Sequence, residues 1–268
     1  MTGDGVNDSP ALSKSDVGFA LGSGTEVAKE ASDIVVLDDN IQSIANAVHY
    51  GRTIYRSVQK FITFQLSVNV SAIFLAFIGP FLGFELPLTM IQLLWINLIM
   101  DTLAALAFSG EPPLIKHMNE RPKSREESII SKEMWSSILF NGFYIGVLCV
   151  VFLTTPVFKS IFIRIDDPAL SQLAFLTAFF SLFVLLNNSN KFNVRVEELN
   201  LFDHIMENKG FLQVVAVIFI VQFVLTEIGG DMFRTTTMSI TEWFCVLGLS
   251  FSIIPADLLR KAIFTKRG

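Results

Sequence analysis

The chain has 268 residues, of which 51% are hydrophobic, and its mean hydropathy is +0.54. Its formal net charge is −5 and no basic block is interleaved with aromatic residues, which argues against nucleic acid as a partner. The apolar residues gather in long runs instead of amphipathic patterns, and this excludes an ordinary soluble domain. Cys149 and Cys245 lie inside such runs without metal-ligand spacing, so we interpret them as buried hydrophobic residues.

Residues 1–42 have the character of a soluble segment. The first four residues are polar and acidic and lack the apolar stretch of a targeting peptide, so we expect the sequence to begin within a longer protein. Glycines separate short apolar pieces, and the β-branched run from Ile34 to Leu37 is followed by two aspartates. This pattern predicts a strand-loop-helix arrangement at one edge of an α/β sheet, although four apolar residues also fit a buried helical turn.

A helical pattern follows, because apolar residues recur at intervals of three and four from Ile41 to Val58 and no proline interrupts the run up to Phe64. We predict that residues 43–60 form a cytosolic stalk helix that continues into the membrane. Six apolar stretches then approach the ~20 residues that are needed to cross a bilayer. They lie near residues 61–79, 87–108, 134–155, 170–187, 211–228 and 239–258. Because backbone polar groups must be satisfied within lipid, we predict a mostly α fold in which residues 61–264 form a six-helix transmembrane bundle.

The distribution of lysine and arginine predicts the orientation of this bundle. Basic residues concentrate in the loops at 109–133 and 188–210 and in the tail, whereas the intervening loops hold few. We therefore expect a multi-pass protein in contact with membrane lipid, with both termini in the cytosol.

The segment from Thr2 to Leu12 reads TGDGVNDSPAL and carries the first candidate site. Asp4 and Asp8 are four residues apart in a glycine-rich turn, and two such carboxylates can hold Mg²⁺, which favours carboxylate and phosphate oxygens. Asn7 and backbone N–H groups could contact a phosphate. For a shorter motif, a solvated acidic turn would be the better interpretation.

The second candidate site lies inside the apolar stretches. A carboxylate at membrane depth is costly and usually faces a polar pathway, which draws attention to Asp101. Asn97 and Asp101 are four residues apart, so an α-helix places them on one face, about 6 Å apart along its axis. Their oxygens suit a cation, while a packing hydrogen bond between helices is the alternative. Asn69 is either a further ligand or a structural amide. We interpret three polar neighbours of Asn69 as packing residues: Gln65, Ser67 and Ser71.

These strings resemble one known family. The segment from Thr2 to Leu12, with residues 22–33 after it, is similar to the hinge motif of P-type ATPases, which belong to the haloacid-dehalogenase-like superfamily. Residues 94–103 resemble the sixth membrane helix of calcium pumps, and residues 64–72 resemble the fifth. The resemblance implies that residues 1–42 are the C-terminal piece of the phosphorylation domain.

The resemblance also implies roles for the candidate residues. Asp4 would be a Mg²⁺ ligand, Asn7 a phosphate contact and Asp8 a support of the aspartyl-phosphate site. Asn97 and Asp101 match residues that bind Ca²⁺ in the family.

Two departures from one branch of the family point to another. Sarcoplasmic-reticulum-type pumps carry a glutamate where this chain has Ala72 and a threonine where it has Met100, and both are ion ligands. Plasma-membrane (calmodulin-type) pumps also lack that glutamate, so the resemblance to them implies one Ca²⁺ per cycle. The run Glu111-Pro112-Pro113 is similar to the same subgroup.

The family's phosphorylation motif, Asp-Lys-Thr-Gly-Thr, does not occur in these 268 residues. The resemblance therefore implies a C-terminal fragment, inactive alone, of a pump that uses ATP and Mg²⁺ to export Ca²⁺ from the cytosol and whose N-terminal half is the missing partner. The tail beyond Asp257 is too short for a calmodulin-binding segment, so we do not expect calmodulin to bind it. The membrane is either the plasma membrane or that of a vacuole or other internal store.

Two alternatives stay open at this point. The chain could be a standalone six-helix membrane protein without catalysis that modulates a full pump. It could also belong to a pump for another cation, because proton pumps and sodium–potassium pumps share parts of these motifs.

Overall fold

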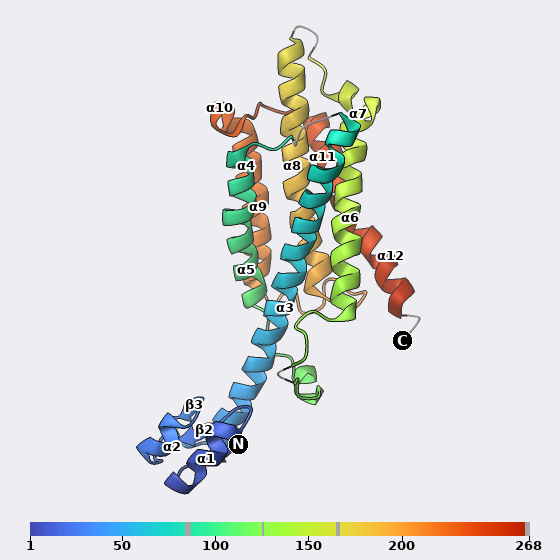
Figure 1. Ribbon diagram of the computed structural model, residues 1–268. Helices are drawn as coiled ribbons and strands as arrows, with labels where there is room; N and C mark the ends of the chain where they lie inside the picture. The colour runs from blue at the N-terminus through green and yellow to red at the C-terminus, as the bar shows by residue number, and fades with distance from the viewer. Residues whose placement is uncertain (84–86, 125, 165–166, 266–268) are drawn as a thin grey trace. The chain divides into compact units, whose positions relative to one another are not determined.

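The computed structural model describes residues 1–83, 87–124, 126–164 and 167–265 (Figure 1). The chain forms two compact units, one made of residues 1–56 and 113–129 and the other of residues 57–112 and 130–268. One helix, α3 (Ile41–Ile78), contributes residues to both units. The first is called the cytosolic-type unit, after the predicted cytosolic position of its stalk helix, and the second the membrane unit.

The cytosolic-type unit contains a three-stranded parallel sheet in the order β1-β2-β3. Its strands are β1 (Thr2–Gly3), β2 (Phe19–Leu21) and β3 (Ile34–Val36). Helix α1 (Ser9–Lys14) connects the first two strands and α2 (Glu26–Glu30) the last two. Leu12 of α1 and Ala28 of α2 are buried and give the small unit its apolar core. This arrangement confirms the predicted α/β edge, because β3 coincides with the β-branched run.

The second segment of the cytosolic-type unit, residues 113–129, is hydrogen-bonded to the first half of α3. This segment contains the 3₁₀ turn Ile115–Asn119. The guanidinium of Arg52 donates from Nη1 to the carbonyl oxygens of His117 at 2.6 Å and Glu120 at 2.8 Å. Arg56 adds an ion pair of 2.9 Å to the Glu120 carboxylate. Because α3 has no proline within its 38 residues, it continues unbroken to Ile78, as the sequence predicts.

The described residues contain six helical segments that are long and apolar enough to cross a membrane, which confirms the predicted number of spans. Their bounds are Ile41–Leu82, Met90–Ser109, Lys132–Thr154, Pro168–Arg195, Lys209–Ile228 and Ile240–Ile263. The third, fourth and fifth are the single helices α6, α8 and α9. Three short helices lie beside their ends: Pro80–Leu82, α7 (Pro156–Ile161) and α10 (Gly230–Phe233).

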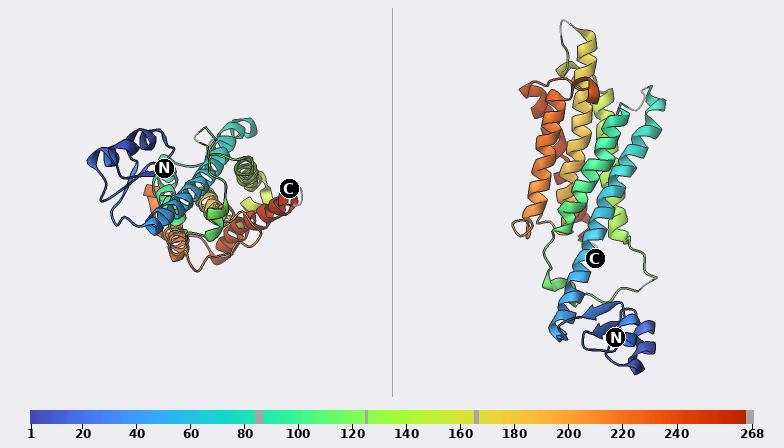
Figure 2. Two further views of the ribbon diagram at one scale, coloured as in Figure 1. Left: turned by 90° about the horizontal axis from the view of Figure 1, so that it is seen from below. Right: turned by 90° about the vertical axis from the view of Figure 1, so that its left-hand side faces the viewer.

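Helix α8 (Pro168–Arg195) is the centre of the membrane unit. It contacts α6 (Lys132–Thr154), α9 (Lys209–Ile228) and both halves of the last span, and Figure 2 shows it running among them. Its buried side chains form a large part of the apolar core. The interior of the unit is therefore organised around one helix.

Two of the predicted spans are not regular helices. The second consists of α4 (Met90–Leu94), a π-helical segment from Trp95 to Met100, and α5 (Asp101–Ser109). In the π segment the Asp101 N–H reaches the carbonyl of Ile96, five residues back, which is the wider hydrogen bond that defines this helix type. Such turns inside α-helices frequently mark functional sites.

The sixth span divides at Ser252 into α11 (Ile240–Phe251) and α12 (Ile253–Thr265). Pro255 has no N–H to donate to the carbonyl four residues back, which explains the interruption. Ser252 lies at the break, where its hydroxyl donates to the Leu249 carbonyl at 2.6 Å and accepts from the Tyr144 hydroxyl at 2.9 Å.

The fourth span is longer than predicted. Helix α8 continues to Arg195, whereas the apolar stretch ends near residue 187 and residues 188–210 were expected to form a basic loop. Lys191 and Arg195 are therefore buried helix residues, with exposures of 0% and 2%. The helix continues because these polar side chains find partners inside the bundle, for example Glu111, which accepts from Arg195 Nε at 2.8 Å.

Candidate cation sites

The first candidate site lies directly after β1, where the chain turns through Gly5 to Asp8. Asp8 Oδ2 accepts hydrogen bonds from the backbone N–H groups of Gly5 and Asp4, both at 3.0 Å. These backbone donors hold the pKa of the Asp8 carboxyl below its usual range. A Cβ on Gly3 would lie 2.5 Å from the Asp8 Cβ, so only glycine allows this close turn. Asp8 thus fixes the shape of the loop.

Asp4 and Asn7 have exposed side chains that make no hydrogen bond within the part of the chain that the structure describes. Asp4 is held through its backbone, because its carbonyl accepts from the Thr25 N–H at 2.8 Å. Its carboxylate stands at the carboxyl end of a parallel strand, where ligands of open α/β sheets bind.

These residues fit a Mg²⁺ ion only in part. Among the described residues, no group of three or more His, Cys, Asp or Glu side chains could hold a metal ion. An open carboxylate at Asp4 suits Mg²⁺, which usually takes one or two carboxylates and completes its shell with waters and substrate phosphates. The site therefore needs a phosphate or water oxygen in addition to the protein.

The second candidate site centres on Asp101 at the start of α5, which is 6% exposed. Its Oδ2 accepts a hydrogen bond of 2.8 Å from Nε2 of Gln65 on α3. Its Oδ1 and the Oε1 of Gln65 are buried, and neither has a hydrogen-bond partner among the described residues. Buried polar atoms normally have partners. Two unused oxygens on a hydrogen-bonded pair of side chains suit an oxygen-liganded cation site.

The two predicted amides are placed differently from each other. Asn97 is exposed, although the carboxylate four residues later is buried, and the π segment between them widens the helical turn. Asn69 on α3 is half-buried. Neither amide is hydrogen-bonded to Asp101 in the described residues, so the structure joins Gln65, and not Asn97 or Asn69, to the carboxylate.

Two residues of this region were missed by the sequence reasoning. Gln65 was interpreted as a packing residue, although it lies one helical turn before Asn69, and this spacing was the available signal. Lys191 was assigned to a cytosolic loop, but it is completely buried in α8. The run of asparagines from Asn187 to Asn190, which extends the apolar stretch with uncharged residues, was the only hint that the helix continues.

A third polar cluster lies at one end of the membrane unit, around Glu111. Its Oε1 accepts from Arg195 Nε at 2.8 Å and from Asn208 Nδ2 at 2.7 Å, and its Oε2 accepts from Lys60 Nζ at 2.7 Å. Both carboxylate oxygens are thus used by protein donors. We interpret this cluster as structural, since no oxygen is left for an ion.

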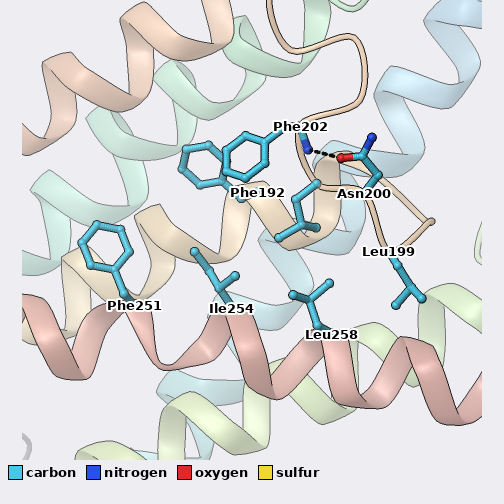
Figure 3. A pocket seen from close by; sticks show the side chains of 8 residues that line it. Phe192, Leu199, Asn200, Phe202, Phe251, Ile254 and Leu258 are labelled. Atoms are coloured by element: carbon cyan, nitrogen blue, oxygen red, sulfur yellow. Dashed lines mark hydrogen bonds between the residues drawn. The ribbon is translucent and has the colours of Figure 1, made fainter.

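An apolar cavity of about 470 Å³ lies between the end of α8 and α11–α12 (Figure 3). Phe192, Phe202 and Phe251 line it together with Ile254 and Leu258. The dashed line in Figure 3 marks a hydrogen bond beside the cavity, in which the Phe202 N–H donates to Asn200 Oδ1 at 3.3 Å. Because no carboxylate lines this cavity, it does not contribute to a cation site.

Comparison with known proteins agrees with the geometry. The family described as "Cation transporting ATPase, C-terminus" matches residues 85–263, and the family described as "haloacid dehalogenase-like hydrolase" matches residues 1–48. Calcium-transporting ATPase 8, plasma membrane-type, of Arabidopsis thaliana is 39% identical over 268 residues, which are 98% of this chain and 25% of that protein. Plasma membrane calcium-transporting ATPase 1 of Homo sapiens is 42% identical over an alignment of 275 residues, which covers 100% of this chain and 22% of that protein.

The chain thus spans about a quarter of the length of the curated relatives that it matches. The predicted resemblance to plasma-membrane calcium-transporting pumps is confirmed along the whole sequence. The chain belongs to the cation-transporting ATPases, in the family that describes their C-terminal part.

Proposed function

We propose that this chain supplies the membrane bundle and the adjoining edge of the phosphorylation domain to an ATP-driven pump that exports Ca²⁺ from the cytosol. The observation that carries the proposal is the buried Asp101 carboxylate with its unused Oδ1. A carboxylate at membrane depth is costly and by default indicates a pathway for ions or substrate. The names of the relatives, which are calcium-transporting ATPases, support Ca²⁺ as the ion.

The proposed Ca²⁺ ligands are Asp101 and Gln65, with Asn97 and Asn69 as further candidates. Asp101 Oδ1 and Gln65 Oε1 are buried and unused, while the exposed amide of Asn97 is open to a ligand. Ca²⁺ takes 6–8 oxygens, so other parts of a complete pump or water molecules must provide the remainder. Asp101 is the one carboxylate among these proposed ligands, which agrees with a single transported ion per cycle.

In the cytosolic-type unit, we propose that Asp4 holds Mg²⁺ and Asn7 contacts the phosphate of the phosphorylated enzyme. Asp8 keeps the loop in shape through its bonds to two backbone N–H groups. Mg²⁺, when bound, would neutralise charge on the phosphoryl group. ATP would be bound by the remainder of the pump, which is the proposed partner of this chain.

The proposed location is a multi-pass position in the plasma membrane or in the membrane of an internal store, with both termini in the cytosol. The names of the relatives favour the plasma membrane. The basic residues of the 109–133 loop support the orientation, whereas Lys191 and Arg195 lie inside α8.

A chimaera tests the function directly. This chain replaces the matching segment of the human relative, and the chimaera is expressed in cells whose own calcium pumps are disabled. We expect ATP-dependent ⁴⁵Ca²⁺ uptake into sealed inside-out vesicles. In Asp101→Asn, the Ca²⁺ concentration for half-maximal phosphorylation by ATP should rise at least about 100-fold, because a site with few carboxylates loses its negative charge. Phosphorylation by inorganic phosphate should persist.

Asp231→Asn is the matched control, since Asp231 is an exposed carboxylate in the same unit. It should leave the half-maximal Ca²⁺ concentration unchanged. A chimaera that inserts and is monodisperse but transports no Ca²⁺ would contradict the proposed function. An unchanged half-maximal concentration in Asp101→Asn would contradict the proposed site.

A further inference from the structure

Lys191 is the most deeply buried cation near the candidate transport site. Its side chain is 0% exposed and lies one helical turn before the end of α8. Its ammonium has three hydrogens to donate, yet in the described residues it makes a single hydrogen bond, of 2.9 Å, to Asn188 Oδ1. Its other contact is the face of the Phe64 ring, whose centre lies 5.1 Å from Nζ. An ammonium in such surroundings needs a negative charge nearby.

Asp101 is the acidic residue with which Lys191 interacts. The two groups interact electrostatically, although no direct ion pair joins them. They are connected through two consecutive residues of α3, because Phe64 covers the ammonium and Gln65 binds the carboxylate. Asn188, which holds the ammonium, is itself fixed by a bond of 3.2 Å from its Nδ2 to the Val215 carbonyl. The position of the cation is therefore determined by the protein.

The charge of Lys191 affects how strongly a cation binds at Asp101. When both groups are ionised and no ion is bound, the single negative charge of Asp101 is balanced by the single positive charge of Lys191. A divalent cation at Asp101 changes the local sum to two positive charges and is repelled by the ammonium. In the interior of a protein this repulsion acts over several ångströms, because the effective dielectric constant is about 20 instead of 80. Sodium or potassium would be repelled about half as strongly.

We propose that Lys191 is a fixed counter-cation of the transport site, which balances Asp101 when the site is empty and weakens the binding of the divalent cation so that the ion is released. This inference rests on the proposed function and goes beyond it. Lys191 does not ligate the ion. It sets the strength of binding through its charge and is therefore a specificity-determining residue.

The test uses the same chimaera and measures the Ca²⁺ concentration for half-maximal phosphorylation by ATP. Lys191→Met removes the charge and keeps a similar length, while Lys191→Gln removes the charge and keeps a polar group for Asn188. Both should lower the half-maximal concentration by roughly tenfold. Lys191→Arg keeps the charge and should leave it near the wild-type value. A purely structural defect at Lys191 would weaken Ca²⁺ binding or leave it unchanged. A decrease in the half-maximal Ca²⁺ concentration therefore distinguishes the counter-cation from a structural role.

Lys159→Met is the matched control. Lys159 is another lysine of the membrane unit whose ammonium lies near a phenylalanine ring, 6.0 Å from the centre of Phe175, but it is exposed and does not contact Asp101. Its removal should leave the half-maximal Ca²⁺ concentration unchanged. If both uncharged variants at Lys191 leave that concentration unchanged or raise it, the counter-cation is ruled out. If Asp101→Asn has no effect, the proposed site fails instead, so the two failures are distinguishable.

If Lys191→Met does not fold, a double variant tests the pairing of Lys191 with Asp101. If Lys191→Met fails to fold because Asp101 is left without its counter-charge, the double variant Asp101→Asn/Lys191→Met should recover a monodisperse protein and raise the thermal midpoint. This recovery supports the pairing. A double variant that is as unstable as Lys191→Met would contradict it.

Discussion

Two carboxylates of the membrane unit, the buried Asp101 and the half-buried Glu111, differ in how many of their oxygens the protein uses. Both oxygens of Glu111 accept hydrogen bonds, from three side chains: Lys60, Arg195 and Asn208. Asp101 uses one oxygen and leaves the other buried without a partner in the described residues. A carboxylate whose two oxygens both accept hydrogen bonds from the protein stabilises the fold. A carboxylate oxygen without such a bond is available for a ligand. Burial alone would not have separated the two residues.

Glu111→Gln should therefore destabilise the membrane unit. Breaking a buried ion pair by removing one partner costs about 3–5 kcal/mol, because the remaining cations lose their counter-charge. Burial alone would raise the pKa of Glu111, but Lys60, Asn208 and Arg195 together lower it below its ordinary value. The stabilisation is thus fully present above the ordinary carboxyl pKa and is lost as the pH falls through the lowered one.

The measurement is thermal unfolding of the purified chain in detergent at several pH values. The difference between wild type and Glu111→Gln should be constant near neutral pH and shrink in acid below pH ~4. Glu127→Gln is the control, because Glu127 forms an exposed pair of 2.9 Å with Lys123 and such pairs contribute little. A difference that persists unchanged in acid would show that the Glu111 charge is not the cause.

At the same scale, the sequence identifies Asp101 because a carboxylate stands out in an apolar stretch. It does not identify Gln65, because glutamine is uncharged and its contact comes from a different helix. Lys191 is misassigned for a related reason, since counting basic residues cannot separate a solvated lysine from one that packs on Phe64. Tertiary contacts decide the role of these side chains.

At the scale of elements, the end of α8 depends on α12. Lys261 Nζ donates to the carbonyls of Asn193 at 2.7 Å and Val196 at 2.6 Å, which are free because the helix ends there. In return, Asn193 Nδ2 donates to the Ile253 carbonyl at 3.1 Å. The last span thus caps the central helix, and the first residue of α12 supplies one of the acceptors.

Lys261→Met should loosen this connection. The buried Asn193 carbonyl and the half-buried Val196 carbonyl lose their donor, and Asp257 loses one of its partners, so we expect a cost of about 2–4 kcal/mol. Hydrogen exchange followed by mass spectrometry should show reduced protection of the last turn of α8, while α6 keeps its protection. Lys159→Met, an exposed lysine, is the control. Equal exchange in both variants would mean that α12 does not cap α8.

The elements themselves were largely predictable. Hydropathy locates all six spans, since a bilayer demands long apolar runs. It does not predict the π segment, because the residues from Trp95 to Met100 are as apolar as their neighbours. Hydropathy also does not predict the extension of α8 to Arg195. Polar residues continue this helix because they form hydrogen bonds inside the bundle, as Arg195 does with Glu111. Pro255 was a visible signal for the break in the last span.

At the scale of the whole membrane unit, polar contacts gather the helix ends into two groups. One group joins the end of α8 to the segment after α5 and the start of α9, through Arg195, Glu111 and Asn208. The other joins α4 to α10, through a bond of 2.8 Å from Gln92 Nε2 to the Phe233 carbonyl. Figure 1 shows α4, α7 and α10 at the same end of the bundle. Consecutive spans therefore alternate in direction.

This alternation predicts which loops share a side of the membrane. We replace the native cysteines by alanine and introduce single cysteines as Lys123→Cys, Lys159→Cys and Asp231→Cys, all at exposed positions. Lys123 follows the second span, Lys159 the third and Asp231 the fifth, so the first should lie opposite the other two. The basic residues of the 113–129 segment predict that its side is the cytosol.

The measurement is labelling with a membrane-impermeant maleimide in sealed microsomes, whose cytosolic face points outward. Lys123→Cys should react in intact vesicles, because the excess of lysine and arginine retains its segment in the cytosol. Lys159→Cys and Asp231→Cys should react only after the vesicles are permeabilised. Labelling after denaturation with detergent controls for expression. Identical behaviour of Lys123→Cys and Asp231→Cys would require an even number of crossings between them, and then one of the three apolar segments that separate them could not span the bilayer.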